Sequence, residues 1–506
     1  MLAQSMLSPA FLLSAFPLGW FSRLSASDTL TLSPKAQIST NTSSSIDSTF
    51  VGFAFEAASF HDYAGPGSPF SRNLVQNIAD RTGAKPIVRV GGTSLDHSFY
   101  NRSLNTWAVI PGNGRGVVKN VTFGPSYFDV FRNWSNVTYT IDCPLAYKNL
   151  NQTLQFAEDA YRVVGHDNIA AFEVGNEPNL YVNVDRPSQY GPTQWVKEWT
   201  HYSTSIADAL NLSTSQRHFQ TLAISHNDPA WDVQNVFPDG LNNVTQRISS
   251  AAFHYYDLQR GNTQMQGQLM NHTFMRRKMA YVADAVSWMK QHHSQIPVMM
   301  NEVGAGEVAN RTLEASFGAA LWLSDYLLYN MAIDVARVNY QQGTGFSFSL
   351  WQPVQRNGRA PEVMPIYYGM LFAAEFLGRS GNVRVKEIGG HHDTLAAYAA
   401  YEGGNLARVA IVNLNLWEQG KARTSTNVTL HVPSDVQNVT VRRLTSTVGA
   451  AGLDPRNVTW AGLVYTKANN GLGRLVGSAS ESVNVQGQDA SLVVNASEAV
   501  IVHVAS

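Results

Sequence analysis

Short apolar runs that suit buried strands alternate with segments of helical periodicity between residues 50 and 351. The strand-like runs lie at residues 50–56, 86–92, 138–143, 171–177, 219–226, 248–256, 296–304 and 338–351. Helix-like stretches separate several of them, at residues 71–82, 150–164, 195–210, 275–292 and 313–331. Eight strands with intervening helices are the order of a (β/α)8 barrel. The sequence therefore predicts an α/β fold, with a TIM barrel at residues 49–378.

The pattern of the sequence changes after about residue 378. Short β-type runs, separated by Gly, Asn, Ser and Pro, lie at residues 383–386, 394–401, 407–414, 428–432, 439–444, 464–465 and 492–504. This pattern predicts a C-terminal all-β sandwich at residues 379–506. The segment 28–48 holds a short strand around Leu30 and a linker, and this strand is a candidate member of the same sandwich.

Several features of the chain indicate secretion. Residues 1–27 contain an apolar run followed by small residues and resemble a signal peptide, and the run is too short for a membrane anchor. Cys143 is the single cysteine, so no internal disulfide can form, and a buried thiol is expected. Glycosylation acceptor triplets, Asn-x-Ser/Thr, begin at Asn41, Asn101, Asn120, Asn133, Asn136, Asn151, Asn211, Asn243, Asn271, Asn310, Asn427, Asn438, Asn457 and Asn495. We predict an extracellular glycoprotein.

The charge of the chain excludes some classes of partner. A net charge of -1 gives no electrostatic support for binding nucleic acid. The histidine pairs His292-His293 and His391-His392 are adjacent, and neighbours on a strand point to opposite faces, so neither pair predicts a metal site. We expect neither a metal nor a cofactor.

Two of the strand-like runs end in the same dipeptide. Residues 171–175, Ala-Phe-Glu-Val-Gly, lead to Asn176-Glu177-Pro178, and Met299-Met300 leads to Asn301-Glu302. Because Pro178 cannot continue a β-ladder, Glu177 should stand where its strand ends. Carboxyl ends of barrel strands converge on one face, so Glu177 and Glu302 should face each other there. Two such carboxylates suit glycoside hydrolysis, although either glutamate alone would suit a surface strand end equally well.

The two Asn-Glu positions resemble the pattern of the retaining (β/α)8 glycosidases of clan A. Within that clan, residues 172–179 and 300–304 and the C-terminal sandwich resemble glycoside hydrolase family 79, which contains secreted β-glucuronidases and heparanases. The resemblance covers the chain from about residue 28 to its end. It implies that Glu177 is the general acid/base, that Glu302 is the nucleophile, and that Asn176 holds the sugar 2-hydroxyl.

The resemblance also suggests further substrate-binding residues. His254 and Tyr256 match the clan's His-x-Tyr motif, in which the tyrosine orients the nucleophile, and Tyr255 is an equally reachable substitute. Glu56 would accept hydrogen bonds from sugar hydroxyls, unless it is a solvated strand-end charge. Trp351 would stack on a sugar face, with core packing as the rival interpretation. Arg89 would support the floor of the site, or form a structural ion pair with a barrel carboxylate.

A glucuronide needs hydrogen-bond donors for its carboxylate. The family implies a tyrosine and backbone amides, and the candidates here are Tyr340 and the glycine-rich stretch from Gly304 to Gly306, in which amides could form an anion-holding concavity. Glu307 lies close by and would repel a glucuronate if it faced the cleft.

The resulting hypothesis is a secreted, retaining enzyme that removes terminal β-linked glucuronic acid, with or without a 4-O-methyl group, from a polysaccharide or proteoglycan. Two alternatives remain at this point. One is another clan A exo-glycosidase, such as a β-xylosidase or β-glucosidase. The other is a catalytically inert carbohydrate-binding wall protein.

Overall fold

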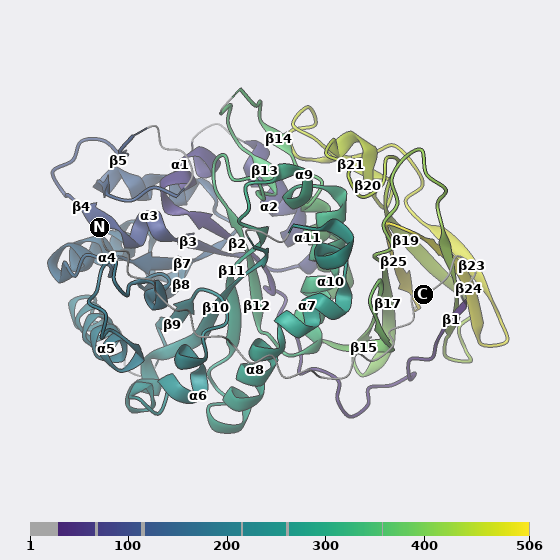
Figure 1. Cartoon of the computed structure of the whole chain (residues 1–506), viewed down its shortest axis with the longest axis horizontal. Coiled ribbons are helices and arrows are strands. Elements are labelled where there is room, and N and C mark those ends of the chain that lie inside the picture. The colour runs from purple at the N-terminus through teal and green to yellow at the C-terminus, as the bar shows by residue number, and fades with distance from the viewer. Residues whose placement is uncertain are drawn as a thin grey trace, which may run out of the picture.

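Eight parallel strands close into a barrel in the computed structural model, which describes residues 29–65, 69–112, 117–213, 216–259, 263–356 and 358–504 (Figure 1). In chain order they are β2 (Val51–Glu56), β3 (Ile87–Gly91), β7 (Thr138–Cys143), β8 (Ile169–Val174), β9 (Phe219–Ile224), β10 (Ile248–Leu258), β11 (Val298–Gly306) and β12 (Arg337–Gln342). Each pairs with the next, and β12 pairs with β2. The predicted (β/α)8 barrel is confirmed, but its last strand ends at Gln342 instead of continuing to Trp351.

Helices follow the strands and cover the outside of the barrel (Figure 1). They are α1 (Ala57–Ala64), α2 (Pro69–Thr82), α3 (Thr93–Asp96), α4 (Leu150–Val164), α5 (Pro192–Ala209), α6 (Val233–Val236), α7 (His272–Lys278), α8 (Ala280–His292), α9 (Arg311–Glu314), α10 (Phe317–Ala332) and α11 (Tyr367–Leu377). Short 3-10 segments lie at Pro125–Asn133, His166–Asn168, Pro178–Leu180, Pro229–Trp231, Leu241–Arg247 and Pro455–Asn457, and a π-helical turn lies at Met265–Leu269.

Two helices expected to be continuous are divided. The stretch 275–292 breaks at Met279 into α7 and α8. The stretch 313–331 breaks at Ser316, whose side chain accepts a hydrogen bond from the Ala319 backbone N–H and so caps the start of α10. Serine is a favoured residue at the N-cap of a helix, which explains why a new helix begins after Ser316.

A small sheet lies in the chain between β3 and β7. Strands β4 (Ser98–Tyr100), β5 (Ala108–Val109) and β6 (Val121–Phe123) form it. A separate two-stranded sheet, β13 (Trp351–Gln352) with β14 (Glu362–Val363), follows β12. Both insertions follow the carboxyl ends of barrel strands, where the loops of this fold shape a binding site.

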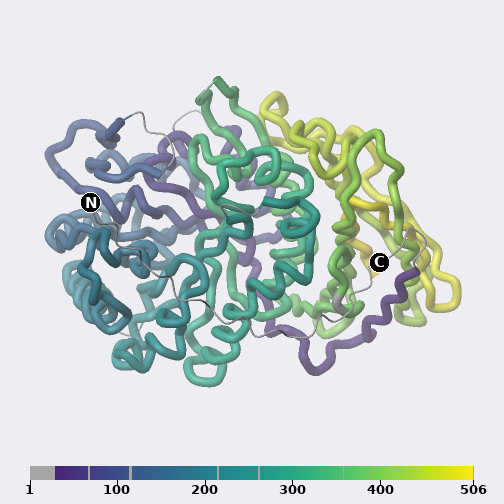
Figure 2. Tube along the Cα trace, viewed as in Figure 1, coloured from purple at the N-terminus to yellow at the C-terminus, as the bar shows by residue number. Residues whose placement is uncertain are grey.

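The C-terminal part forms a two-layered β structure. Its strands are β15 (Val383–His392), β16 (Leu395–Glu402), β17 (Asn405–Asn413), β18 (Ser425–His431), β19 (Asn438–Ser446), β20 (Val458–Trp460), β21 (Leu463–Tyr465), β22 (Gly473–Leu475), β23 (Glu481–Gln486), β24 (Asp489–Asn495) and β25 (Glu498–His503). The N-terminal strand β1 (Thr29–Leu32) pairs in parallel with β18. In Figure 2 the purple end of the coloured tube lies beside the green and yellow segments of the C-terminal part. Side chains of both layers, among them Leu30, Val409 and Val428, form one apolar cluster between them.

Two helices join the barrel to the sandwich. Both α10 and α11 lie between the barrel strands and the sandwich strands β17 and β25 (Figure 1). Nearly every residue of both helices is buried, because one side faces the barrel and the other faces the sandwich. Their side chains share one apolar core with Tyr398, Val412 and Ile501 of the sandwich.

The predicted signal peptide, residues 1–27, lies outside the described residues. Among the residues that the structure describes, no helix has the length and apolar character needed to cross a membrane.

Candidate active site

The chain turns away from the barrel immediately after β8. Gly175 has φ of 80°, where an added Cβ would lie 2.9 Å from Leu145 and from the Tyr181 hydroxyl. Glu177 also has a left-handed backbone, with φ of 51°. Its N–H donates to the carbonyl of Ala223, 2.9 Å away. Such backbone is costly for a non-glycine residue and is typical of functional positions, and here it directs Glu177 to the carboxyl end of the barrel.

An irregularity in β11 turns two neighbouring side chains into the barrel. Residues on a regular strand alternate between faces, so Asn301 and Glu302 should point in opposite directions. The register shifts between Phe253 and His254 of β10, which pair with Met300 and Glu302, so β11 has one extra residue at this point. Such a bulge re-aims side chains. Both Asn301 and Glu302 therefore bond to partners inside the barrel.

Glu177 and Glu302 face each other across His254. One carboxylate oxygen of each glutamate and one ring nitrogen of His254 all lie within 4.8 Å of one another. The Nδ1 atom of His254 is 2.9 Å from Oε1 of Glu177, and the histidine is fully buried. This spacing fits the ~5–5.5 Å of a retaining glycosidase and is shorter than the ~6.5–9.5 Å of an inverting one.

Glu302 receives two strong donors. The Tyr256 hydroxyl donates to its Oε1, and Nη1 of Arg89 donates to its Oε2, each at 2.6 Å. Burial by itself would raise the pKa of Glu302, but the charges of His254 and Arg89 and the two hydrogen bonds hold it below its usual range. Glu302 is therefore ionised and held in a fixed orientation.

Arg89 connects the two halves of the site. Its guanidinium contacts Glu302 and, through Nη2, donates to Oδ1 of Asn176 at 2.7 Å. It also pairs with Glu173 of β8, and all of these groups are buried. Arg89 thus supports the site floor and forms a barrel ion pair at once. Glu173 was not singled out from the sequence, although a charged residue within the apolar run 171–175 was a signal for a buried ionic contact.

Glu56 ends β2 on the same face of the barrel. Its Oε1 accepts from the Ser94 backbone N–H at 2.6 Å, and Gln341 donates to its Oε2 at 3.3 Å. Burial and the charge of Glu302 raise the pKa of Glu56 to about 7, despite the hydrogen bond from Ser94. Glu56 lines the same cleft as Glu177 and Glu302.

These groups open into a cleft of about 560 Å3, within the size range of small-molecule sites. Its aromatic wall is made by Tyr256, Phe346 and Phe348. Glu307 also lines it, and burial and the charges of Glu177 and Glu302 raise the pKa of Glu307 to about 7. The other lining residues are Glu56, Thr93, Val117, Ser225, His226, Leu258, Gln259, Ala309, Gln341, Gly345 and Ser347, so among the described lining residues there is no lysine or arginine.

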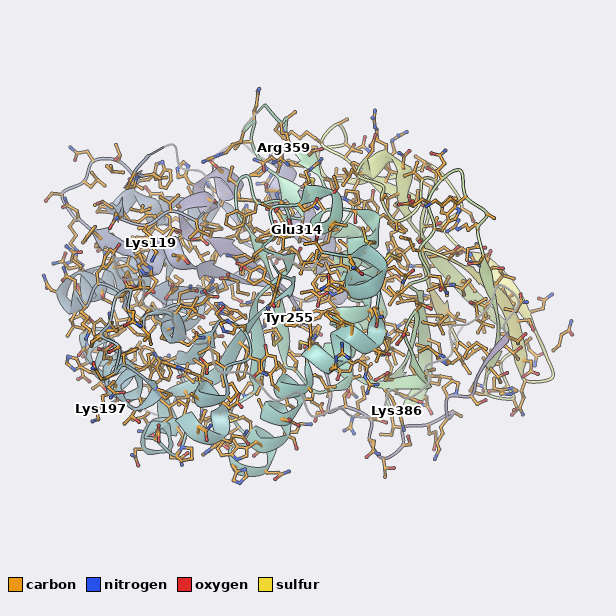
Figure 3. The ribbon with its side chains drawn as sticks, in the orientation of Figure 1. Lys119, Lys197, Tyr255, Glu314, Arg359 and Lys386 are labelled. Carbon is orange, nitrogen blue, oxygen red and sulfur yellow. The ribbon has the colours of Figure 1, made fainter. Side chains whose placement is uncertain are left out.

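Two aromatic residues expected in the site lie outside it, Tyr255 as the substitute for Tyr256 and Trp351 as a platform for the sugar. The Tyr255 hydroxyl donates to Asp257, and its ring stacks on Tyr326 of α10, with 5.1 Å between ring centroids (Tyr255 is labelled in Figure 3). It faces the helices because it alternates with His254 and Tyr256, which face the barrel interior. Trp351 is fully buried among Phe53, Phe55 and Tyr63, and its indole N–H donates to Ser71. Core packing, the rival interpretation, applies to Trp351.

Tyr340, Gly304 and Gly306, which were expected to bind the sugar carboxylate, do not line the cleft. Tyr340 is fully buried, and its hydroxyl donates to the Phe348 carbonyl at 2.8 Å, so it supports the cleft wall from behind. Gly304 and Gly306 belong to β11 and pair with Tyr256 and Leu258, so they form a strand end instead of an anion-holding loop. A Cβ at Gly304 would approach the Tyr256 ring to 2.6 Å, which explains why glycine is needed at this position.

Within the described residues, Glu177, His254 and Glu302 form the group whose donor atoms lie closely enough to hold a metal ion. Several of their donor atoms are already engaged by protein partners. Glu302 is bonded to Tyr256 and Arg89, and the His254 Nδ1 to Glu177. The adjacent Arg89 cation would also oppose a metal cation.

Comparisons relate the chain to known glycoside hydrolases. Residues 397–501 match the model of the glycosyl hydrolase family 79 C-terminal beta domain. A β-glucuronidase of Aspergillus niger is 28% identical over 459 residues, 82% of each chain, and one of Neurospora crassa is 27% identical over 407 residues, 72% of each chain. The structure of a 4-O-α-L-rhamnosyl-β-D-glucuronidase from Fusarium oxysporum 12S has a TM-score of 0.83 at 21% identity, covering 94% of this chain and 100% of that one. This structural likeness supports the fold.

Proposed function

This chain belongs to glycoside hydrolase family 79, and from that premise we propose that it is a retaining β-glucuronidase. The observation that carries the proposal is the carboxylate pair, Glu177 and Glu302, whose oxygens approach within 4.8 Å. The spacing leaves no room for the water that an inverting enzyme places between its carboxylates. A double displacement through a glycosyl-enzyme is the reaction that it suits.

The surroundings of the two glutamates favour different roles. Glu302 is held ionised by Arg89 and Tyr256, as a nucleophile requires. Glu177 has one side-chain partner among the described residues, the His254 ring. Carboxyl pairs with unlike environments divide into an ionised group and a proton donor. This difference assigns the general acid/base role to Glu177.

In the first step, Glu302 attacks the anomeric carbon while the bond to the leaving oxygen breaks and Glu177 donates its proton to that oxygen. In the second step, Glu177 takes a proton from water as the water oxygen attacks the anomeric carbon and releases Glu302. The Oδ1 atom of Asn176 accepts from Arg89, so its Nδ2 is left to donate to the sugar 2-hydroxyl. This contact would strengthen at the transition state.

We propose terminal β-linked glucuronic acid, with or without a 4-O-methyl group, as the sugar that is removed. The β-glucuronidases that match most of the chain support this substrate. The name of the Fusarium enzyme adds a rhamnose-capped glucuronide as a variant to test. Secretion is part of the proposal and rests on the predicted signal peptide and the acceptor asparagines.

A neutral glycoside is the second candidate substrate, and a specific observation favours it. Glu307 faces the cleft, and the described lining holds no lysine or arginine to pair with a glucuronate. A β-xyloside or β-glucoside would need no such partner. The inert wall-protein alternative is set aside, because the chain is a glycosidase of this family with both carboxylates in place.

The test measures hydrolysis of p-nitrophenyl β-glucuronide beside the xyloside and the glucoside, with wild type and the Glu302→Gln variant. We expect glucuronide turnover by the wild type alone, and proton NMR of the reaction should show the β-anomer of the sugar first. Cleavage of only a neutral glycoside would contradict the substrate and keep the reaction. Wild-type turnover by the variant, or the α-anomer first, would contradict the mechanism.

A further inference from the structure

Glu173 lies under the site without reaching the cleft. It belongs to β8, is buried, and does not line the cleft. Its Oε1 accepts from Nε and Nη2 of Arg89, and its Oε2 accepts from the side-chain amides of Gln220 and Asn301. A carboxylate has about four lone-pair positions, and here each one receives an N–H. This arrangement is that of a buried carboxylate paired with the Arg89 cation.

Both amides present their NH2 groups to Glu173, because a carboxylate can only accept. Their oxygens have partners of their own in this arrangement. Oε1 of Gln220 accepts from the Ser250 hydroxyl, and Oδ1 of Asn301 accepts from Asn339. The layer of polar side chains beneath the site is built around the charge of this one residue.

Arg89 is shared between two anions. Nη1 contacts Glu302, while Nη2 and Nε contact Glu173. An arginine paired with Glu302 alone would place its whole charge on the nucleophile and make it a weaker base. Glu173 neutralises part of that charge and also repels Glu302 through the guanidinium.

We propose that Glu173 is a positioning residue that divides the charge of Arg89 and so keeps the Glu302 nucleophile basic enough to attack. Through Arg89 it also fixes Asn176, which the same guanidinium contacts. This inference rests on the proposed role of Glu302 as nucleophile. The other titratable groups facing Glu302 belong to different elements and stay unchanged in the test: Glu56, Glu177, His254, Tyr256 and Glu307.

The test is the pH profile of kcat/KM for the Glu173→Gln variant. The acid limb of this profile reports the ionisation of the nucleophile in the free enzyme. Removing the charge of Glu173 should move the acid limb to lower pH by on the order of 0.5 to 1 pH unit, less than the ~1–3 units of a charge in direct contact. A weaker nucleophile should also lower kcat/KM for glycosides with poor leaving groups.

Asp142 supplies the matched control. It is as deeply buried as Glu173 and lies on the neighbouring strand, paired with Glu173 in the β-ladder. Neither of its oxygens has a side-chain hydrogen-bond partner among the described residues. Burial and then the charge of Glu173 raise its pKa well above the usual range, which favours the neutral acid. Asp142→Asn should therefore leave the acid limb where it is in the wild type.

A second variant keeps the proposal open to refutation if Glu173→Gln does not fold. Glu173→Asp retains the charge, so its acid limb should stay in the wild-type position even where shortening lowers kcat. An unmoved limb in the folded Gln variant, or a displaced limb in the Asp variant, would overturn the proposal. Profiles are measured on whichever glycoside the wild type cleaves, with Glu302→Gln in parallel, so a wrong substrate or a wrong nucleophile is recognised separately.

Discussion

Replacing Tyr256 by phenylalanine removes the hydroxyl group that donates a hydrogen bond to Glu302, the proposed nucleophile. The packing of the aromatic ring stays in place. The hydroxyl donates to Oε1 of Glu302 at 2.6 Å, while the ring packs edge-on to Phe348 and lies against Gly304. The hydrogen bond stabilises the ionised form of Glu302. Its loss raises the pKa of Glu302, and the acid limb of the kcat/KM profile should move to higher pH.

The size of the shift follows from the hydrogen bond. A bond to a charged acceptor contributes ~1.5–3 kcal/mol, and one pKa unit corresponds to ~1.36 kcal/mol, so complete loss would amount to ~1–2 units. Tyr256 borders the cleft, so water can replace part of the lost bond. We therefore expect a shift of about one pH unit, measured with p-nitrophenyl β-glucuronide. The direction is opposite to that expected for Glu173→Gln.

Tyr255→Phe is the matched control for this experiment. It removes the same atom from the adjacent residue, whose hydroxyl donates to Asp257 away from the cleft. Its acid limb should coincide with that of the wild type. Equal limbs for wild type and Tyr256→Phe, or equal shifts for both variants, would refute the argument that Tyr256 controls the ionisation of Glu302.

Three further predictions follow from other groups. Glu177→Gln should lower kcat/KM by ~10²–10⁴-fold for glycosides with poor leaving groups and much less for activated aryl glycosides, because only the former need a proton; equal losses on both would argue against the acid role. Glu307→Gln should raise the ratio of glucuronide to xyloside turnover above pH 7 and change this ratio little at pH 5. The reason is that the pKa of Glu307 is about 7 and that its ionised form repels a glucuronate. The same ratio in wild type and variant would show that Glu307 does not face the sugar carboxylate. His272 lies between Asp325 and Glu387, and the charges of these two carboxylates outweigh the effect of burial and raise the pKa of His272 to about 9. The contribution of His272 to the unfolding free energy is therefore complete below pH ~6.5 and is lost as pH rises through about 9. Urea unfolding of His272→Gln should show a loss of roughly 3–5 kcal/mol at pH 6 that shrinks towards pH 10, and a loss independent of pH would contradict this sign.

The barrel and the proximity of Glu177 and Glu302 could be read from the sequence because both follow from local patterns. Alternation of apolar runs with helical segments predicts the order of strands, and the structure has a strand in each of the eight expected places. Asn176-Glu177-Pro178 and Asn301-Glu302 each follow an apolar run, and Glu177 does stand just past the end of β8, whereas β11 continues beyond Glu302 to Gly306. The fold rule that strand ends converge then brought Glu177 and Glu302 together.

Aromatic side chains show where local patterns stop being informative. Trp351 and Tyr340 belong to strand-like runs in the same way as Tyr256, yet the first two are buried behind the cleft. A large apolar ring suits a core and a sugar-binding wall equally well. Phe346 and Phe348, which do line the cleft, had no distinguishing signal in the sequence.

The remaining features of the site depend on closure of the barrel. Arg89 meets Glu173 and Glu302, which are distant in the chain, only because strands β3, β8 and β11 share one interior. The bulge that turns both Asn301 and Glu302 inward is a property of the pairing between β10 and β11, and no rule of alternation within one strand contains it. Local periodicity thus places residues along the chain and at strand ends, whereas the partners and charge of each buried group arise from contacts between strands.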